Sequence, residues 1–423
     1  MQVSKLFPIN SLVFNPWLGW FCIGLFGIFQ FVLQGSIGIL SPGIKESFQV
    51  DATSISILSS SFFYSYILMQ VPVGMFYDTF KIRHVAAAAL VVVGLSCLLI
   101  AFAPSIGFAI CARILMGLGC SFGFIGVLFC TKHWFAPARF AFLSGVAECV
   151  SMGGTGFMNL LLSEASKELG WRWAVGICGG WALLLAVVVW IFLAQAHRHN
   201  ALPKKELELE AVSHRRFARS LRVVLTTKEM WIGGAFSACT FSVMSAFVGL
   251  WGVPFLMQMY AMDVVAATSA LAMIYLGVGS SSPLLGWLVS RVSIQRLMAI
   301  GSTLCFFILL VILYVKALPL LVLYGLLFGL GFTCAVYQLS FTLVCHAVPD
   351  YCQGVAIGTT NMITMISAPI LQPIIGVLLS LSQGGILDGF ETYTIAAYQR
   401  ALVILPICYG LAFFISLLLR EKH

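Results

Sequence analysis

The chain has 423 residues, of which 61% are hydrophobic and only 9% are charged. Soluble globular domains are roughly 45–50% apolar and about 25% charged, so the composition excludes an ordinary soluble domain. Apolar runs of about 20 residues, the length of a membrane-spanning helix, recur between short polar turns. The spans are therefore expected to be helices and not the alternating ten-residue strands of a membrane barrel. The net charge of +8 then requires no nucleic-acid partner.

Twelve spans are predicted, six on each side of one long polar segment. That segment, 196–228, separates an N-terminal bundle (1–195) from a C-terminal bundle (229–423). Its charges favour either an amphipathic helix on the anionic membrane surface or a solvated tether. The predicted spans are 17–40, 54–77, 84–103, 105–130, 138–163, 171–195, 229–259, 264–289, 294–315, 318–345, 350–381 and 398–419.

The distribution of cations predicts the orientation. Of the 23 Lys and Arg residues, 17 fall on the side of the chain termini, five on the other side and one, Arg113, within a span. Because cytoplasmic loops carry the excess of cations, both termini are expected in the cytoplasm of a bacterial inner-membrane protein. The 13 cysteines form no CxxC pair and are expected to pack as small core residues, with no metal site and no cofactor.

An internal duplication supports two equivalent halves. Gly74 and Gly286 are separated by 286 − 74 = 212 positions, and Gly117 and Gly329 by 329 − 117 = 212. The pattern predicts an all-α membrane protein with twelve transmembrane helices in two pseudo-symmetric six-helix bundles. Parallel repeats of this kind enclose a central cavity near the middle of the bilayer.

The short turn between the second and third spans carries Gly74, Asp78 and Arg83, and its weaker copy carries Gly286 and Arg291. On these residues, and on Arg113-x-x-x-Gly117, the chain resembles the major facilitator superfamily over almost its whole length. The resemblance implies that Gly74, Asp78, Arg83, Gly286 and Arg291 form a cytoplasmic gate. Lys81 stands where the superfamily has a glycine, so the gate would rest mainly on Asp78 and Arg83.

The second span, 58–74, is also similar to that of a branch containing bacterial nutrient permeases and lysosomal dipeptide carriers. That similarity favours an amino acid, a small peptide or an organic acid as the solute.

Two ionisable residues, Arg113 and Glu148, fall deep within spans and are therefore candidates for function. Counting residues from the span ends places both near mid-depth, on spans that we expect to be neighbours. Three interpretations stay open. Glu148 could carry a proton under the influence of Arg113, Arg113 could bind a substrate carboxylate while Glu148 orients it or meets an amine, or the two could form a fixed buried salt bridge. Their counterparts in the second half, Gly325 and Asn361, are uncharged, which favours a solute that is itself asymmetric.

Further polar and aromatic side chains within the spans are candidates for the cavity lining, although helix packing is the favoured interpretation of each of them. They are Gln30, Gln34, Tyr64, Tyr66, Phe247, Trp251, Tyr337, Gln338, Asn361 and Gln372.

These observations predict a secondary transporter, and not an enzyme, that moves a small polar solute by alternating access, with proton symport as one mode. A facilitative uniporter and a drug exporter are alternatives within the class, the exporter being disfavoured because the fifth span lacks a Gly-Pro pair. A solute sensor or scaffold is the alternative from another class. The expected partners are the lipid bilayer, the solute and, in the symport mode, protons, and the chain is expected to be a monomer.

Overall fold

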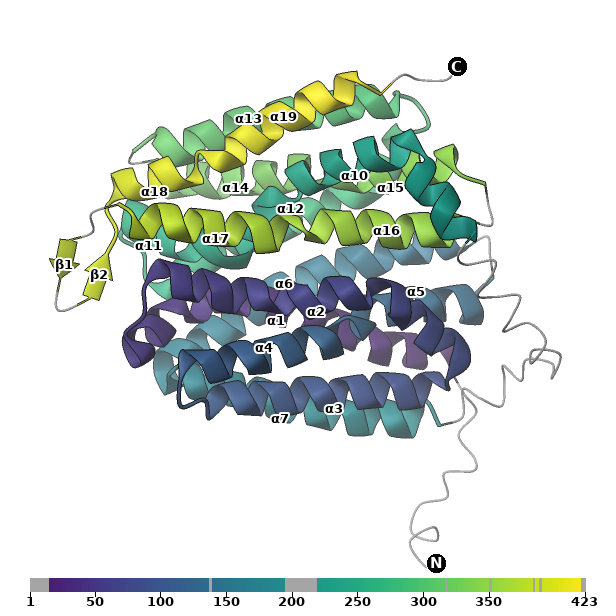
Figure 1. Cartoon of the computed structure of the whole chain (residues 1–423), viewed down its shortest axis with the longest axis horizontal. Coiled ribbons are helices and arrows are strands. Elements are labelled where there is room, and N and C mark those ends of the chain that lie inside the picture. Colours follow the sequence, from purple (N-terminus) through teal and green to yellow (C-terminus); the bar gives the residue numbers. More distant parts are fainter. Residues whose placement is uncertain are drawn as a thin grey trace, which may run out of the picture.

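The computed structural model describes residues 15–136, 139–194, 219–316, 318–349, 352–382, 385–387 and 390–419. Within these ranges the chain forms twelve helical passes (Figure 1). The first six are α1 (Pro16–Phe48), α2 (Ala52–Thr79), α3 (Ile82–Ala101), α4 (Ile106–Cys120) with α5 (Phe122–Trp134), α6 (Phe140–Leu169) and α7 (Trp171–Phe192).

The second six passes contain more interruptions than the first six. They are α10 (Lys228–Thr240) with the π-helix η4 (Val243–Trp251) and α11 (Gly252–Tyr260), α12 (Val264–Leu288), α13 (Ile294–Tyr314), α14 (Leu320–Cys334) with the 3₁₀ helix η5 (Ala335–Gln338) and α15 (Leu339–Ala347), α16 (Gln353–Met365) with α17 (Ser367–Ser380), and α18 (Ile395–Leu402) with α19 (Ile404–Leu417).

The predicted all-α membrane fold is confirmed. Eleven of the described passes are long and apolar enough to cross a bilayer. The twelfth, α6, runs beside them (Figure 1) and carries a more polar sequence that includes Glu148, Glu164 and Lys167. A run of about 20 apolar residues determines a span because lipid offers no partner for backbone polar groups, which must then bond within the helix.

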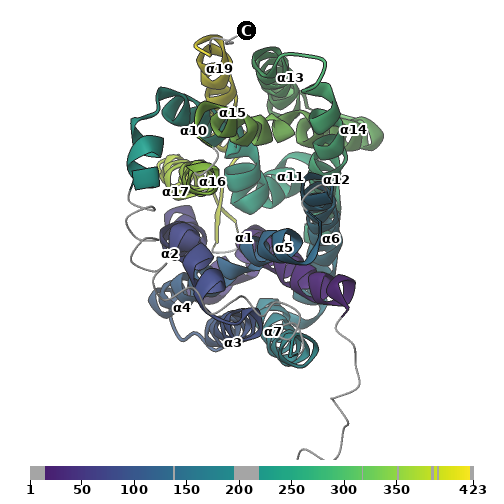
Figure 2. The ribbon, with the colours of Figure 1, turned by 90° about the vertical axis from the view of Figure 1, so that its right-hand side faces the viewer.

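The passes form two bundles, which are seen end-on in Figure 2. Equivalent pairs of helices pack through glycine in both bundles. In the first, Gly117 on α4 lies against the Phe62 carbonyl on α2, and in the second, Gly331 on α14 lies against the Ile274 carbonyl on α12. Phe62 and Ile274 differ by 212 positions, the offset of the sequence repeat, whereas the two glycines differ by 331 − 117 = 214. Close packing between the equivalent helices therefore recurs, with the packing glycine two positions further along.

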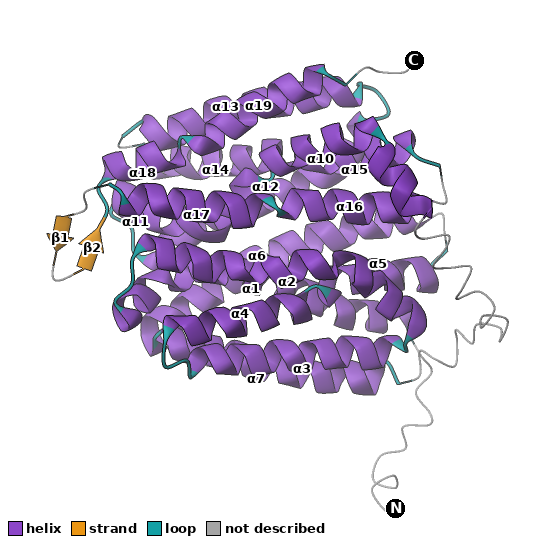
Figure 3. Cartoon of the chain, viewed as in Figure 1, coloured by secondary structure: helices purple, strands orange, loops and turns teal. Residues whose placement is uncertain are grey.

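One described segment differs from the helical expectation. A short antiparallel hairpin, β1 (Gly385–Leu387) with β2 (Phe390–Thr392), lies outside the bundles between α17 and α18 (Figure 3). Most of the predicted linker, residues 195–218, lies outside the described residues, so its two interpretations stay predictions. Residues 219–226 are helical and lead into α10.

The molecule has two ends, which we name by the chain segments found there. The linker face is the end where α7 stops at Phe192 and α10 starts at Lys228, on the right in Figure 1. The distal face is the end where α1 stops at Phe48 and α2 starts at Ala52, on the left.

Candidate functional site

A cavity of about 840 Å³ lies between the two bundles. Its lining extends from Gly35 on α1 and Gly249 in η4, near mid-depth, to Gly286 on α12 and Gly354 on α16, close to the linker face. A volume of this size falls within the roughly 300–1,000 Å³ typical of small-molecule sites. The site is thus built from both halves and is reached from the linker face.

At the distal face the two bundles are joined by polar contacts. The Thr53 hydroxyl lies 3.0 Å from that of Ser380, the Ser380 hydroxyl donates to the Asp51 carboxylate at 3.2 Å, and the Ala52 N–H donates to the Tyr393 hydroxyl at 3.2 Å. Partial burial works to raise the pKa of Asp51, but hydrogen bonds from Ser54 at the start of α2, and then from Ser380 and Thr53, lower this pKa overall. The N-cap of α2 is therefore also a link between the bundles.

One salt bridge is present in the described parts of the chain, and it also crosses the distal face. Lys167 at the end of α6 donates to Asp263, the N-cap of α12, at 2.9 Å. A hydrogen bond from the Ala266 N–H, and as the second largest cause a hydrogen bond from the Lys167 ammonium, lower the pKa of the Asp263 carboxyl. Both side chains are about half exposed, so the pair contributes little to closing this face.

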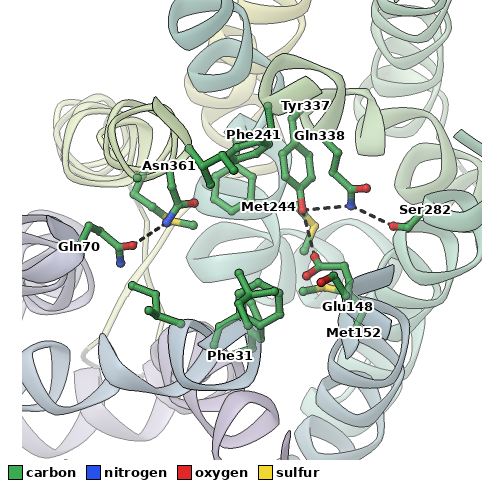
Figure 4. A pocket seen from close by; sticks show the side chains of 18 of the residues that line it. Phe31, Gln70, Glu148, Met152, Phe241, Met244, Ser282, Tyr337, Gln338 and Asn361 are labelled. Carbon is green, nitrogen blue, oxygen red and sulfur yellow. Dashed lines mark hydrogen bonds between the residues drawn. The ribbon is translucent and has the colours of Figure 1, made fainter. Parts of the chain in front are cut away.

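Glu148 lies at one side of the cavity within a chain of neutral donors (Figure 4). The Tyr337 hydroxyl donates to the Glu148 carboxylate at 3.4 Å, across the two bundles. The Gln338 amide donates to Tyr337 at 3.5 Å and to the Ser282 hydroxyl at 2.9 Å. Among the lining residues that the structure describes, Glu148 is the only charged one.

A second polar contact between the bundles lies on the other side of the cavity in Figure 4. The Asn361 amide on α16 donates to the Gln70 side-chain oxygen on α2 at 2.8 Å. Between the two polar groups the described lining is rich in aromatic and Met side chains: Phe31, Phe63, Phe124, Phe241, Phe341, Met75, Met152, Met244 and Met365.

Arg113 lies behind the wall of the cavity and is fully buried. Its two terminal nitrogens donate to Ser36 at 3.3 Å, to Met116 sulfur at 3.0 Å and to the Gln34 carbonyl at 3.1 Å, and its guanidinium lies 5.0 Å from the centre of the Phe62 ring. The salt bridge considered between Arg113 and Glu148 is absent from these described residues. The predicted fourth and fifth spans do meet, through α5 and α6, but Arg113 lies on α4, and α1 packs against both α4 and α6.

Half of the ten candidate lining residues border the cavity: Gln34, Tyr66, Tyr337, Gln338 and Asn361. The expectation is corrected for the other five, which lie outside the lining. Tyr64 is 44% exposed on the outer surface of the bundle, and Phe247 is buried in the core. Gln30, Trp251 and Gln372 are occupied in holding interrupted helices together.

These three side chains bond to backbone groups at the interruptions. Gln30 accepts from the Phe124 N–H at 2.8 Å, just after the break between α4 and α5, and donates to Tyr66 at 2.8 Å. Gln372 donates to the Ser245 carbonyl in the π-helix at 2.7 Å, and Trp251 donates to the Gln372 carbonyl at 3.3 Å. These polar side chains bond to backbone groups and do not border the cavity, so their polarity alone did not identify lining residues.

The proposed gate residues lie at the linker face. Gly74 and Gly286 border the cavity there. Arg83 packs over the Trp190 ring at 5.1 Å and Arg291 over the Trp287 ring at 4.1 Å, each within its own bundle. The side chain of Asp78 lies outside the described residues, so its part in the gate stays a prediction.

Sequence reasoning missed several lining residues. Ser282 was passed over because a Ser within a span is ordinary, and Phe31, Phe241, Met152 and Met244 because apolar side chains are what every span contains. The π-helix η4, which displaces the local helical register near Phe241 and Met244, gives no pattern in the sequence that could have revealed them.

Comparison with known proteins establishes the family. The family model of the Major Facilitator Superfamily matches residues 19–372. The chain belongs to this superfamily. Among curated relatives of this Major Facilitator Superfamily protein, Uncharacterized transporter YybO of Bacillus subtilis is 25% identical over 61% of the chain and 58% of its own length. Probable sulfoacetate transporter SauU of Cupriavidus necator is 24% identical over 45% of the chain and 44% of its own length. The matches thus span about half of each relative.

Solved structures of the superfamily share the fold. A bacterial homologue of the human lysosomal transporter Spinster, in an inward-facing and unoccupied conformation, superimposes with a TM-score of 0.79 at 16% identity and covers 95% of this chain and 96% of that one. The nucleoside transporter NupG superimposes with a TM-score of 0.68 at 13% identity, covering 96% of this chain and 100% of that one. At these identities the likeness concerns the fold alone.

Proposed function

We propose that this superfamily member is a secondary transporter that moves a small solute by alternating access, with the cavity as its solute site. The observation that carries the proposal is the difference between the two ends of one interface: the cavity opens toward the linker face, while side-chain contacts join the bundles at the distal face. Rocking of the two halves about a fixed mid-depth site is how parallel-repeat transporters expose that site to each side in turn. With the termini in the cytoplasm, the present conformation faces inward.

Glu148 is the group proposed to couple transport to protons. It is the single charge in the described lining, and it accepts a hydrogen bond from Tyr337 across the bundles. Loss of its negative charge would weaken that bond, so a proton on Glu148 would alter a contact that must change when the halves rock.

Counterflow in proteoliposomes tests the proposal. Solutes that raise the thermal midpoint of the purified protein are taken from a screen of amino acids, dipeptides, amines and organic acids, since ligands that bind the folded state stabilise it. A transporter will exchange a labelled hit for the unlabelled solute across the membrane. Saturable binding without exchange would instead support the sensor interpretation and overturn the transporter.

The Glu148→Gln variant tests the coupling. It should lose accumulation driven by a proton gradient and keep counterflow when the solute is supplied at a concentration that saturates the variant. Equal accumulation by parent and variant would remove Glu148 from the coupling mechanism. The matched control is Glu164→Gln, which changes an exposed carboxylate nearer the distal end of the same helix.

A further inference from the structure

The charge of the cavity wall carries an inference that rests on the proposed function and specifies its substrate. The Glu148 carboxylate has only neutral partners among the described residues, namely the Tyr337 hydroxyl and, beyond it, Gln338 and Ser282. A carboxylate at this depth is costly without a positive counterpart. When it is ionised, this carboxylate therefore presents an unneutralised negative charge to the cavity.

An anion finds no matching contact in the same wall. Arg113 is the cation that the sequence suggested as an anchor, but it lies outside the lining, and Ser36, Met116 and the Gln34 carbonyl occupy its terminal nitrogens. A carboxylate-bearing solute in the cavity would face the charge of Glu148 without direct contact with a guanidinium. Charge complementarity therefore favours a cation.

The rest of the described lining fits the body of an organic cation. Aromatic faces such as those of Phe31, Phe124 and Phe241 attract a cationic nitrogen and also pack against apolar carbon. Met152 and Met244 are flexible, polarisable side chains that adapt to irregular shapes. A small inorganic cation would leave most of the 840 Å³ cavity and its apolar wall unused.

We propose that the solute carries a protonated amine that pairs with Glu148, while its apolar body packs among the Phe and Met side chains of the cavity. Tyr337 holds the Glu148 carboxylate toward the amine and so acts as a positioning residue. One carboxylate neutralises one positive charge at a time, so amine and proton displace each other on Glu148. Coupling then takes the form of an exchange, in which the carboxylate gives up a proton when the amine binds and regains one when the amine leaves.

A matched panel tests the proposal on the parent protein, without any variant. Phenethylamine, 3-phenylpropionate and 2-phenylethanol share one aromatic body and end in a cationic, an anionic and a neutral group. The second series, 3-methylbutylamine, 4-methylpentanoate and 3-methylbutanol, carries the same end groups on an aliphatic body. The amines are expected to raise the thermal midpoint, with an effect that weakens on acidification because protons compete. The proposal would be overturned if only a carboxylate stabilises the protein, or if neither amine raises the thermal midpoint at concentrations up to about 20 mM.

Variants then locate the amine. Glu148→Gln should weaken amine binding by about tenfold or more, the value of a hydrogen bond to a charged group, and should abolish the dependence on pH. Glu164→Gln should bind like the parent. If Glu148→Gln binds the amine as tightly as the parent, the pairing is wrong.

The two proposals fail in different ways. If 3-phenylpropionate binds and is exchanged across proteoliposomes, amine recognition fails while the transporter stands. If an amine binds through Glu148 but is never exchanged, the transporter fails while amine recognition stands.

Discussion

The two ends of the interface between the bundles are held together by different kinds of contact. At the distal face, hydroxyl groups, a helix N-cap and glycine packing bring α2 against α17. Nearer the linker face, two polar bonds between the bundles, Tyr337 to Glu148 and Asn361 to Gln70, lie on either side of a cavity. Close packing therefore holds the distal end shut, while the bonds at the other end leave room for a solute between them.

The largest expected effect comes from Gly376 on α17. A methyl group there would lie 2.5 Å from the Ser56 hydroxyl and 2.9 Å from the Ala52 carbonyl of the opposite bundle. Gly376→Ala should destabilise the closed distal face by about 1–3 kcal/mol, which is roughly a 5–150-fold shift in population toward opening. Hydrogen exchange in lipid nanodiscs should then become faster in segments 49–56 and 376–382.

Gly180→Ala is the control for this substitution, because nothing lies within 4 Å of the added methyl group. Its exchange should match that of the parent. If Gly376→Ala also matches the parent, close packing does not hold the distal face shut.

A smaller effect is expected from Asp51, which caps α2 through the Ser54 N–H at 2.9 Å and accepts from Ser380 in the other bundle. Asp51→Ala should cost about 0.5–2 kcal/mol for the lost cap. Exchange should rise both in the first turn of α2 and at the end of α17. Ser105→Ala, which removes the cap of α4 on the same face, should act on α4 alone. If Asp51→Ala raises exchange only in the first turn of α2, the hydrogen bond to Ser380 does not help to hold the two bundles together.

Acid should weaken the same link. Because the pKa of Asp51 is lowered from its ordinary 3.8, the ionised carboxyl stabilises the closed face above that value, and the stabilisation is lost as the pH falls through the lowered pKa. Asp51→Asn keeps a good N-cap but cannot titrate. The difference in thermal midpoint between the parent and Asp51→Asn should be constant above about pH 5 and shrink below pH 4. A constant difference down to pH 3 would contradict this.

The smallest effect is expected from the Lys167–Asp263 pair, whose side chains are 47% and 50% exposed. Exposed ion pairs contribute little because water and salt screen them. Lys167→Ala should leave hydrogen exchange at the distal face within error of the parent at 150 mM salt. If Lys167→Ala speeds exchange at the distal face as much as Gly376→Ala does, the ion pair contributes as much to closure as close packing, contrary to this prediction.

The sequence predicted the spans well because each span depends on its own composition. Depth within the membrane also follows from counting residues, and Glu148 does face the cavity. Which way a helix is turned depends on its neighbours, and for this reason Arg113, predicted at the same depth as Glu148, lies behind the wall.

Polar side chains within the spans have two different structural roles. Gln338 and Asn361 border the cavity, whereas Gln30 and Gln372 bond to backbone groups at a helix break and in the π-helix. The two uses look the same in sequence, because an interruption of backbone hydrogen bonding has no residue pattern of its own here. Contacts such as Thr53 with Ser380 join residues more than 300 positions apart and follow only from the assembled bundles.

In the proposed alternating-access cycle, the closed distal face also sets how strongly a solute binds from that side. A solute arriving there meets a site that exists only in the fraction of molecules whose distal face is open. Its apparent affinity is the intrinsic affinity multiplied by that fraction, so each 1.4 kcal/mol that the packing of Gly376 and its neighbours contributes to closure weakens binding from the distal side about tenfold. One glycine contact thereby makes a site with a single intrinsic affinity behave as a weak site on one side of the membrane and a strong site on the other.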